Sequence, residues 1–371
     1  MKQTQKHIVI DARIRRSSTG RYIDRLLEHL QKTDTVHRYS VLIQPDDPWQ
    51  PAASNFTAVK TKYGQFSLNP LNEFGFTRQL YALNADIVHY TTNAQPLFYF
   101  RPTITTTMDL TMLRFTRAGK TPLPIFWLKM AAYRTMFWLG NKKSKAIIAI
   151  SNFTRDDLIK NYPFTKNKIT VTYCASEPPI RENAKKPTYL GNGEPFLLYV
   201  GAAFPHKNLP FLVDSLPEIV GQPDLKLVLA GKKEYYYRKL DEYIGKKSYS
   251  NRIITPGFVS DAELKWLYEN CSAYVFPSLS EGFGLPGLEA MVHGCPVVSS
   301  NATCLPEVYG DAAHYFDPKN VDDMTNKISS VLTDKKLRDE LISKGYKQAA
   351  KYSWQKMAQQ TLDVYSEVLK T

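Results

Sequence analysis

Short apolar runs alternate with stretches of helical period along the whole chain. The runs of the first half have the length and composition of buried strands and lie at residues 8–10, 39–43, 86–90, 103–107 and 146–150. Those of the second half lie at residues 196–200, 226–230, 253–254, 273–276 and 296–299. Helical periods cover residues 21–30, 209–219, 261–268, 285–293 and 354–369. Strands that alternate with helices predict βαβ units with parallel sheets, and therefore an α/β fold.

A polar segment separates the two halves. Residues 177–195 have no periodicity and contain the structure breakers Pro178, Pro179, Pro187, Gly191, Gly193 and Pro195. With 371 residues, the chain is long enough for two cores. We predict an N-terminal domain over residues 1–178, a linker over 179–195, a C-terminal domain over 196–350 and a final helical segment over 351–371.

The charge balance narrows the choice of partners. Forty-eight basic and 35 acidic residues give a net charge of +13, which favours phosphates, nucleic acid or an anionic membrane surface. The four cysteines form no CxxC pair, and we interpret Cys271 and Cys295 as buried free thiols in a reducing compartment. Asp11 directly follows the first apolar run, which is therefore too short for a signal peptide and is predicted to be a strand. No stretch reaches the ~20 apolar residues of a spanning helix.

The most informative segment is glycine-rich and covers residues 277–291. Gly282 and Gly284 allow the backbone to approach a ligand closely, and the helix that starts after them directs its positive end at a phosphate. Glu281 and Glu289, eight residues apart, would accept hydrogen bonds from hydroxyls. Two such carboxylates suit a ligand with two polyol parts, such as a ribose and a hexose. The alternative is a glycine-rich turn with two surface glutamates.

This segment resembles the retaining glycosyltransferases of family 4, which have the GT-B fold. The resemblance rests on Glu281-x7-Glu289 with Gly-Phe-Gly-Leu-Pro inside it. It continues through motifs at residues 199–201, 206–208, 257–264, 294–298, 305–308 and 310–313, and covers most of residues 196–318. It implies two Rossmann-like domains whose parallel sheets face each other across a cleft. The closest members build polysaccharide chains and are often mannosyl- or rhamnosyltransferases.

The resemblance implies roles for individual residues of the C-terminal domain. Glu289 would hold the nucleotide ribose, Glu281 would contact the donor sugar at the reaction centre, and Lys207 would neutralise the diphosphate. Backbone N–H groups of the stretch Gly282, Phe283, Gly284 and Leu285 would meet the sugar and diphosphate. The remaining donor-side positions are Gly201, His206, Gly257, Phe258, Val259 and Ser278. The alternative for Lys207 is a solvated surface lysine.

The second half departs from the family pattern in one respect. Many members carry an arginine just after the glycine that matches Gly201, where this chain has Ala202 and Ala203. His206 stands where an arginine commonly precedes the lysine. The diphosphate clamp is therefore lighter here, or is completed by Arg252 or Lys232.

The N-terminal domain matches the family less closely. Gly20, after Ser18 and Thr19, resembles the glycine loop that approaches donor and acceptor, although Ser18 or Thr19 could simply cap a helix.

Met108 replaces the histidine that points at the donor sugar in relatives. Asp109 would orient the acceptor or cap the following loop. His89 would supply an imidazole on the acceptor side or lie satisfied in the core, and Ser151 is interpreted as a helix cap.

A basic aromatic stretch covers residues 117–145, with seven basic residues and no acidic one. It also contains Phe126, Trp127, Tyr133, Phe137 and Trp138. One interpretation is an interfacial helix on anionic lipid, and the other is a core helix with a solvated basic edge. Nucleic acid is not predicted as a partner, because no recognition motif accompanies the charge.

The resulting hypothesis is the transfer of a hexosyl group, with mannosyl as the first choice by resemblance, from a GDP- or UDP-linked sugar to a glycan or lipid-linked acceptor in cell-surface polysaccharide synthesis. The resemblance implies retention of configuration by front-face attack, a cytoplasmic location or one on the inner face of the membrane, and no cofactor. No metal is expected, since no Asp-x-Asp element follows a strand. The alternatives are a nucleotide-sugar epimerase, a sugar phosphorylase, and a non-catalytic nucleotide-sugar or glycan-binding relative.

Overall fold

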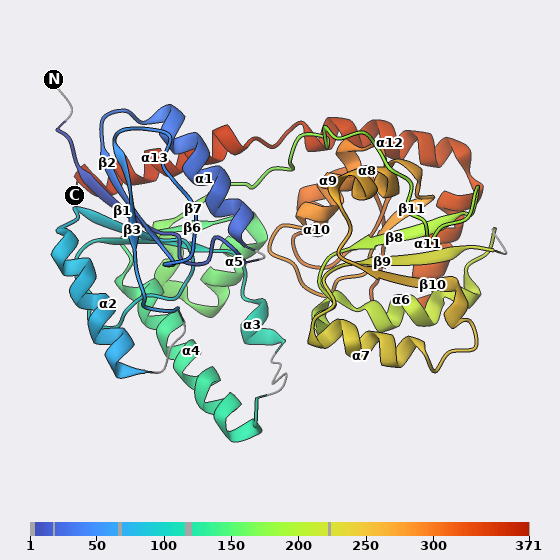
Figure 1. The fold of residues 1–371 in the computed structure, drawn as a ribbon, viewed down its shortest axis with the longest axis horizontal. Coiled ribbons are helices and arrows are strands. Elements are labelled where there is room, and N and C mark those ends of the chain that lie inside the picture. The colour runs from blue at the N-terminus through green and yellow to red at the C-terminus, as the bar shows by residue number, and fades with distance from the viewer. Residues whose placement is uncertain (1–3, 18, 66–68, 116–120, 222–223, 371) are drawn as a thin grey trace. The chain divides into compact units, whose positions relative to one another are not determined.

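The chain divides into two compact units. A computed structural model describes residues 4–17, 19–65, 69–115, 121–221 and 224–370. Unit 1 consists of Met1–Cys174 together with Ser353–Thr371, and unit 2 of Ala175–Tyr352 (Figure 1). The last helix, α13 (Trp354–Lys370), thus belongs to unit 1, where it packs on α1 (Gly20–Thr33). Residues 172–195 lead into unit 2 without forming a helix or strand.

Unit 1 is built on a parallel sheet. Within the described residues it has seven strands in the order β3-β2-β1-β4-β5-β6-β7. These strands are β1 (His7–Asp11), β2 (Arg38–Ile43), β3 (Phe56–Lys60), β4 (Ile87–Tyr90), β5 (Thr103–Thr107), β6 (Ala146–Ala149) and β7 (Ile169–Val171). Its other helices are α2 (Pro70–Leu83), α3 (Thr111–Arg114), α4 (Leu123–Lys143), α5 (Asn152–Asn161) and η1 (Pro163–Lys168). Helices α1 and α13 cover one face of the sheet, and α2 and α4 lie on the other (Figure 1).

Unit 2 repeats this architecture. Its described residues form a six-stranded parallel sheet in the order β10-β9-β8-β11-β12-β13. The strands are β8 (Phe196–Val200), β9 (Lys226–Ala230), β10 (Ile253–Gly257), β11 (Ala273–Phe276), β12 (Val297–Ser300) and β13 (Ala313–Phe316). Its helices are α6 (Leu209–Ser215), α7 (Tyr235–Ile244), α8 (Asp261–Asn270), α9 (Leu285–Val292), α10 (Leu305–Tyr309), α11 (Val321–Thr333) and α12 (Lys335–Ala349). Short 3-10 turns are η2 (Pro205–Lys207), η3 (Leu216–Glu218), η4 (Ser250–Arg252) and η5 (Gly310–Ala312).

Both sheets have the strand order of Rossmann-like domains, so the predicted α/β class is confirmed. The first strand of each unit lies inside its sheet. From it, the next two strands are added on one side of the sheet and the later strands on the other, so the order switches sides between β1 and β4 and between β8 and β11. Loops that leave the carboxyl ends of two such strands diverge, and open α/β sheets bind ligands at this point. The sequence elements of interest in unit 2 follow β8 and β11 directly.

The structure also bears on the predicted helix at residues 209–219, the cysteines and membrane-spanning segments. The helix predicted over residues 209–219 is too long: α6 ends at Ser215 and a 3-10 turn follows, because Pro217 has no N–H to continue the α-helical ladder. Cys271 and Cys295 are buried free thiols, as predicted. Among the helices described, none is long and apolar enough to cross a membrane.

Candidate functional site

An ion pair forms at the switch point of unit 2. The ammonium nitrogen of Lys207, at the end of η2, lies 2.6 Å from a carboxylate oxygen of Glu281, in the loop after β11. Their side chains are only 16% and 11% exposed, so the pair is largely removed from water. These residues stand 74 positions apart in sequence and meet because β8 and β11 are neighbours in the sheet. A cation and a carboxylate are thereby held side by side.

The two loops that carry this pair are fastened to each other and to the sheet. The N–H of Leu279 donates to the carbonyl of His206, at 2.7 Å. The side chain of His206 is buried, and the Lys207 ammonium lies 5.6 Å from the centre of the Phe276 ring. The predicted donor position His206 thus contributes a backbone link between the two loops, and its buried ring stacks on Phe204.

A neighbouring loop, which sequence reasoning missed, holds the backbone of Glu281 from both sides. The N–H of Glu281 donates to the Thr303 hydroxyl at 3.1 Å, and the Cys304 thiol donates to the Glu281 carbonyl at 3.3 Å. Thr303 has a φ of 56°, a left-handed conformation that is rare for a β-branched residue and costs about 1–3 kcal/mol. The hydrogen bond to Glu281 gives this strained residue a role in orienting the glutamate.

Replacing Thr303 with valine should lower the stability of unit 2 by about 1–3 kcal/mol, because the partly buried Glu281 N–H loses its acceptor while the shape is kept. Thr303→Ser is the matched control: it retains the hydroxyl without the second branch, so its melting temperature should equal or exceed that of the wild type. Thermal melts followed by circular dichroism compare the two. Equal melting temperatures for the valine and serine variants would show that the hydrogen bond contributes nothing.

The start of α9 faces this same loop. Gly284 caps the helix with a φ of 89°, and the Tyr309 hydroxyl donates to its carbonyl at 2.5 Å. A Cβ on Gly284 would lie 2.6 Å from both Tyr309 and Leu305, so only glycine fits the space. Since α9 begins at Leu285, its positive end lies directly beyond the Glu281 loop. This arrangement favours negative charge beside the ion pair.

The second glutamate of the motif lies one turn into α9. A carboxylate oxygen of Glu289 lies 3.5 Å from the hydroxyl of Tyr268, on α8. Tyr268 also stacks on His293, whose ring contacts the Glu289 carbonyl at 2.7 Å. The side chain of Glu289 therefore lies beside Tyr268 in a partly exposed position.

The other donor-side positions divide into backbone and side-chain groups. Gly201 follows strand β8 and Gly257 ends strand β10, and both have a positive φ. Phe258, next to Gly257 in the chain, is 83% exposed. Leu285, partly exposed, is the first residue of α9. The buried positions of the motif are Val259, Ser278, Gly282 and Phe283.

Phe283 and Ser278 differ in their surroundings. The Phe283 ring packs edge-on against Tyr352 at 5.4 Å, so only the main chain of Phe283 is available to a ligand. The Ser278 carbonyl accepts from the Ser300 hydroxyl at 2.6 Å, while the Ser278 hydroxyl is buried without a hydrogen-bond partner in the described structure.

The predicted positions of unit 1 lie at the start of α1, in the segment after β5 and within β4. Gly20 begins α1, and its N–H donates to the Ser17 carbonyl at 2.9 Å, with the Arg15 carbonyl so close that a Cβ would overlap it. The capping alternative fails for Thr19, which occupies the N-cap position without a side-chain cap bond, and Ser18 lies outside the described residues.

The segment after β5 is arranged as a turn. The Asp109 carboxylate accepts a hydrogen bond from the N–H of Thr111 at 2.7 Å. This contact caps the following loop, which is one of the two roles expected for Asp109. The Met108 carbonyl accepts from Thr154 at 3.2 Å, and Ser151 caps α5 with its side chain, as interpreted from the sequence. The Asp109 carboxylate is thus engaged with its own loop.

His89 lies in the interior of unit 1. Its ring nitrogens contact the Tyr365 hydroxyl at 2.6 Å and the Thr106 hydroxyl at 2.8 Å, and the residue is fully buried. Burial lowers the pKa of His89 to about 3, so the imidazole is neutral at ordinary pH. These are the contacts of a core histidine that ties α13 to the sheet, so the acceptor-side interpretation is wrong.

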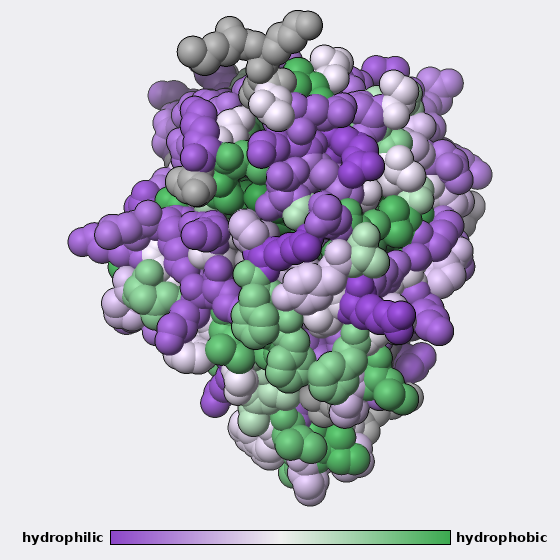
Figure 2. Space-filling model, turned by 90° about the vertical axis from the view of Figure 1, so that its left-hand side faces the viewer, coloured by the Kyte–Doolittle hydropathy of each residue, from purple (hydrophilic) through white to green (hydrophobic). Residues whose placement is uncertain are grey.

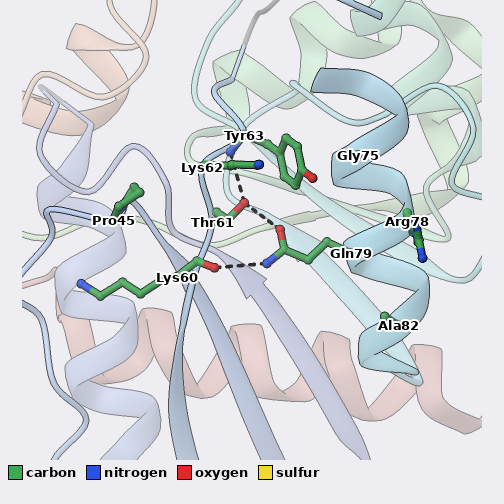
Figure 3. Close-up of a pocket in the computed structure, with 9 residues that line it drawn as sticks. All are labelled: Pro45, Lys60, Thr61, Lys62, Tyr63, Gly75, Arg78, Gln79 and Ala82. Carbon is green, nitrogen blue, oxygen red and sulfur yellow. Dashed lines mark hydrogen bonds between the residues drawn. The ribbon is translucent and has the colours of Figure 1, made fainter. Parts of the chain in front are cut away.

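A separate cavity of about 580 Å³ lies in unit 1 between the ends of β2 and β3 and the side of α2 (Figure 3). It is lined by Pro45, Lys60, Thr61, Lys62, Tyr63, Gly75, Arg78, Gln79 and Ala82. Gln79 joins its two walls through Thr61, at 2.7 Å, and the Lys60 carbonyl, at 3.2 Å. The residues predicted from the sequence lie elsewhere.

Comparison with protein families assigns both halves of the chain. Residues 180–348 match the model of glycosyl transferases group 1, and residues 19–177 match glycosyltransferase family 4. The chain belongs to the family 4 glycosyltransferases. The resemblance read from the Glu281-x7-Glu289 motif is confirmed.

Curated relatives of this glycosyltransferase include O-antigen enzymes. It is 33% identical over 230 residues to O-antigen chain mannosyltransferase B of Escherichia coli, an alignment that covers 60% of each chain. It is 36% identical over 183 residues to the serotype-specific mannosyltransferase WbdA of Escherichia coli, covering 47% of this chain and 22% of that one. The chain therefore aligns with less than two thirds of the length of these relatives.

Solved structures share the fold over the whole glycosyltransferase. Sucrose-phosphate synthase from Thermosynechococcus elongatus has a TM-score of 0.76 at 16% identity, covering 99% of this chain and 100% of that one. Anabaena HepE in complex with UDP and glucose has a TM-score of 0.73 at 18% identity, with 98% and 100% covered. At these identities the likeness shows the GT-B fold alone, which confirms the predicted fold class.

Proposed function

We propose that this chain transfers a hexosyl group from a nucleoside diphosphate sugar to a hydroxyl group of a growing glycan. The observation that carries the proposal is the Lys207–Glu281 ion pair at the switch point of unit 2, beside the positive end of α9. A departing nucleoside diphosphate gathers negative charge, and a preorganised cation stabilises it. Hydroxyl groups of the sugar supply donors for the Glu281 carboxylate.

The roles of the two glutamates follow from their places. Glu281 is paired with the cation of Lys207, so it belongs beside the transferred sugar and the diphosphate, while Glu289 lies one turn into α9 and belongs beside the ribose. Phe258, exposed at the end of β10, offers an aromatic face to the nucleobase. On unit 1, Gly20 provides close backbone approach, and the acceptor side uses the segment of Met108 and Asp109.

The names of the curated relatives point to mannose as the transferred sugar. Mannosyltransferases of O-antigen chains match this chain at 33–36% identity over about half of its length. We therefore propose GDP-mannose as the first donor to test and UDP-sugars as the next, with a lipid-linked or free glycan as the acceptor. The proposed sugar transfer takes place in the cytoplasm or at the inner face of the cell membrane.

The proposed transfer retains the anomeric configuration. The bond between C1 of the sugar and the diphosphate oxygen breaks, and a bond from C1 to the acceptor oxygen forms on the same face. The acceptor proton passes to the departing phosphate oxygen, so no protein base is consumed. We propose that Lys207 and the start of α9, and no metal ion or cofactor, supply the positive charge. The described part of the chain holds no group of three or more His, Cys, Asp or Glu side chains suited to a metal ion.

A thermal-shift experiment in EDTA tests the donor site part by part. GDP at about 100 times its Kd should stabilise the wild type by about 2.7 kcal/mol, and GDP-mannose should stabilise it further. Glu289→Gln should reduce the shift with both ligands, since it weakens the ribose contact. Glu281→Gln should reduce only the increment that mannose adds.

Four results would decide against the proposal or its parts. Equal shifts for all variants would remove the two glutamates from the site. Binding without transfer to any glycan acceptor would indicate the non-catalytic relative, and a change of the sugar without transfer would indicate an epimerase. Uridine nucleotides that stabilise more than guanosine nucleotides would correct the donor.

A further inference from the structure

Exposed hydrophobic side chains are concentrated on one part of unit 1. Within the described residues, twelve of the sixteen large ones lie between residues 71 and 164. They are Leu71, Phe74, Tyr81, Phe98, Phe100, Met112, Leu123, Ile125, Trp127, Leu128, Trp138 and Phe164. Figure 2, which faces the left-hand side of Figure 1, shows hydrophobic side chains gathered in the lower half of this side. Soluble proteins rarely leave so many together without a function.

Helix α4 contributes the most unusual part of this surface. A surface helix normally hides one apolar stripe and exposes a polar face. In α4, Phe126 and Met130 are buried, yet Leu123, Trp127 and Leu128 on the other sides are 53–64% exposed. The first turns of α4 therefore present apolar side chains to solvent in several directions.

Stacked aromatic rings continue the surface from α2 toward the end of α4. Phe74 stacks on Phe98 with ring centres 5.3 Å apart, although both rings are about half exposed. Phe100, 73% exposed, has the ammonium of Lys143 5.6 Å from its ring centre. Lys143 also donates to the carbonyls of residues 96, 97 and 99, which fastens this loop to α4.

The C-terminal end of α4 repeats the combination of ring and cation. Trp138 meets Phe164 edge-on at 6.4 Å, and the ammonium of Lys142 lies 4.7 Å from the Trp138 ring. Lys168 lies 5.7 Å from the Phe164 ring. Aromatic rings with adjacent lysines suit a membrane interface, where the ring enters the boundary region and the ammonium reaches the phosphates.

The charge of this surface has one sign along α4. Residues 117–145 contain seven basic residues and no acidic one, and Lys129, Arg134, Lys142 and Lys145 are exposed. In the structure as described, none of these four pairs with a carboxylate. The one acidic side chain of α2, Glu73, turns inward and accepts from the backbone of residues 97 and 98.

We propose that the α2–α4 surface, made of the exposed side chains of α2, residues 98–100 and α4, docks on an anionic lipid bilayer. Apolar side chains from the first turns of α4 enter the boundary between headgroups and acyl chains, and the basic residues contact lipid phosphates. A second copy of the chain is the less favoured occupant, because the basic face of α4 would meet its own charge. The proposal goes beyond glycosyl transfer and is measured without donor or acceptor.

Vesicle flotation of the full chain tests the surface. Vesicles of phosphatidylcholine with 30% phosphatidylglycerol, about the anionic content of many membranes, should bind the protein in low salt, and pure phosphatidylcholine should bind it at least about tenfold less. Salt at about 0.5 M should reduce binding to the anionic vesicles by about fivefold or more. Trp127→Gln combined with Leu128→Gln should lower the partition coefficient by about tenfold, and Lys129→Gln combined with Arg134→Gln by a similar factor.

A matched variant and a second readout make the result decisive. Val220→Gln combined with Lys336→Gln removes one exposed apolar and one exposed basic residue from unit 2 and should leave binding unchanged. Circular dichroism melts should match the wild type for all three variants, since the altered side chains are exposed. No binding to anionic vesicles, or equal binding by the α4 variants and the wild type, would overturn the proposal. So would sedimentation that shows a dimer abolished by the α4 variants, which would assign the surface to a second copy.

Discussion

Replacing Lys207 with methionine should lower kcat/KM for sugar transfer by about 100-fold or more, the loss typical when one preorganised charge-stabilising group is removed from an active site. Lys207 lies at the switch point with its ammonium 2.6 Å from Glu281 and little contact with water. Methionine keeps the length and apolar packing of the side chain over Phe276 but cannot balance the charge of a departing diphosphate. Steady-state kinetics with a nucleotide sugar and a glycan acceptor measure the effect.

The same substitution should also lower stability, and a double variant separates the two effects. Without Lys207, the Glu281 carboxylate remains 11% exposed and unbalanced, which should cost about 1–3 kcal/mol. Lys207→Met combined with Glu281→Gln removes both charges and should melt above the single variant, yet remain as inactive. Lys336→Met, an exposed lysine of unit 2, should change neither property. Wild-type kcat/KM in Lys207→Met would exclude this lysine from the donor site.

The fold could be predicted well where strands are buried on both faces. The bounds of β8, β9 and β11 coincide with apolar runs in the sequence, because parallel strands in the middle of a sheet pack against helices on both sides. β3, β7 and β13 were not predicted, and each lies at an edge of its sheet with partly exposed residues. An edge strand lacks a neighbour on one side, so its sequence carries no continuous apolar run.

The site shows the same limit in another form. The motif around Glu281 could be recognised in the sequence, but its contact with Lys207 depends on β8 and β11 being neighbours, which the chain order does not reveal. Thr303 could not be found, because its role depends on a left-handed backbone and a hydrogen bond to a residue 22 positions away. The core position of His89 could not be predicted either, because its ring bonds to the hydroxyl of Tyr365, which lies 276 positions further along the chain.

Gly284→Ala should destabilise unit 2 by about 2–4 kcal/mol. Gly284 has a φ of 89°, which an alanine adopts only with strain, and its new Cβ would lie 2.6 Å from Leu305 and from the Tyr309 hydroxyl. Both neighbours are fully buried, so the overlap moves the start of α9 or the loop at residues 301–305. For a unit of this size the melting temperature should fall by about 5–15 °C.

Gly193→Ala distinguishes the backbone strain from the overlap. Gly193 has a similar φ of 73°, but no atom lies within 4 Å of its added Cβ, so this variant reports the conformational cost alone, at about 1 kcal/mol. The difference between the two variants measures how firmly Tyr309 and Leu305 hold the start of α9. If both variants lose the same stability, the close packing around Gly284 is unimportant. If Gly284→Ala also loses the thermal shift with GDP while Gly193→Ala keeps it, the position of the first turn of α9 is what the nucleotide diphosphate requires.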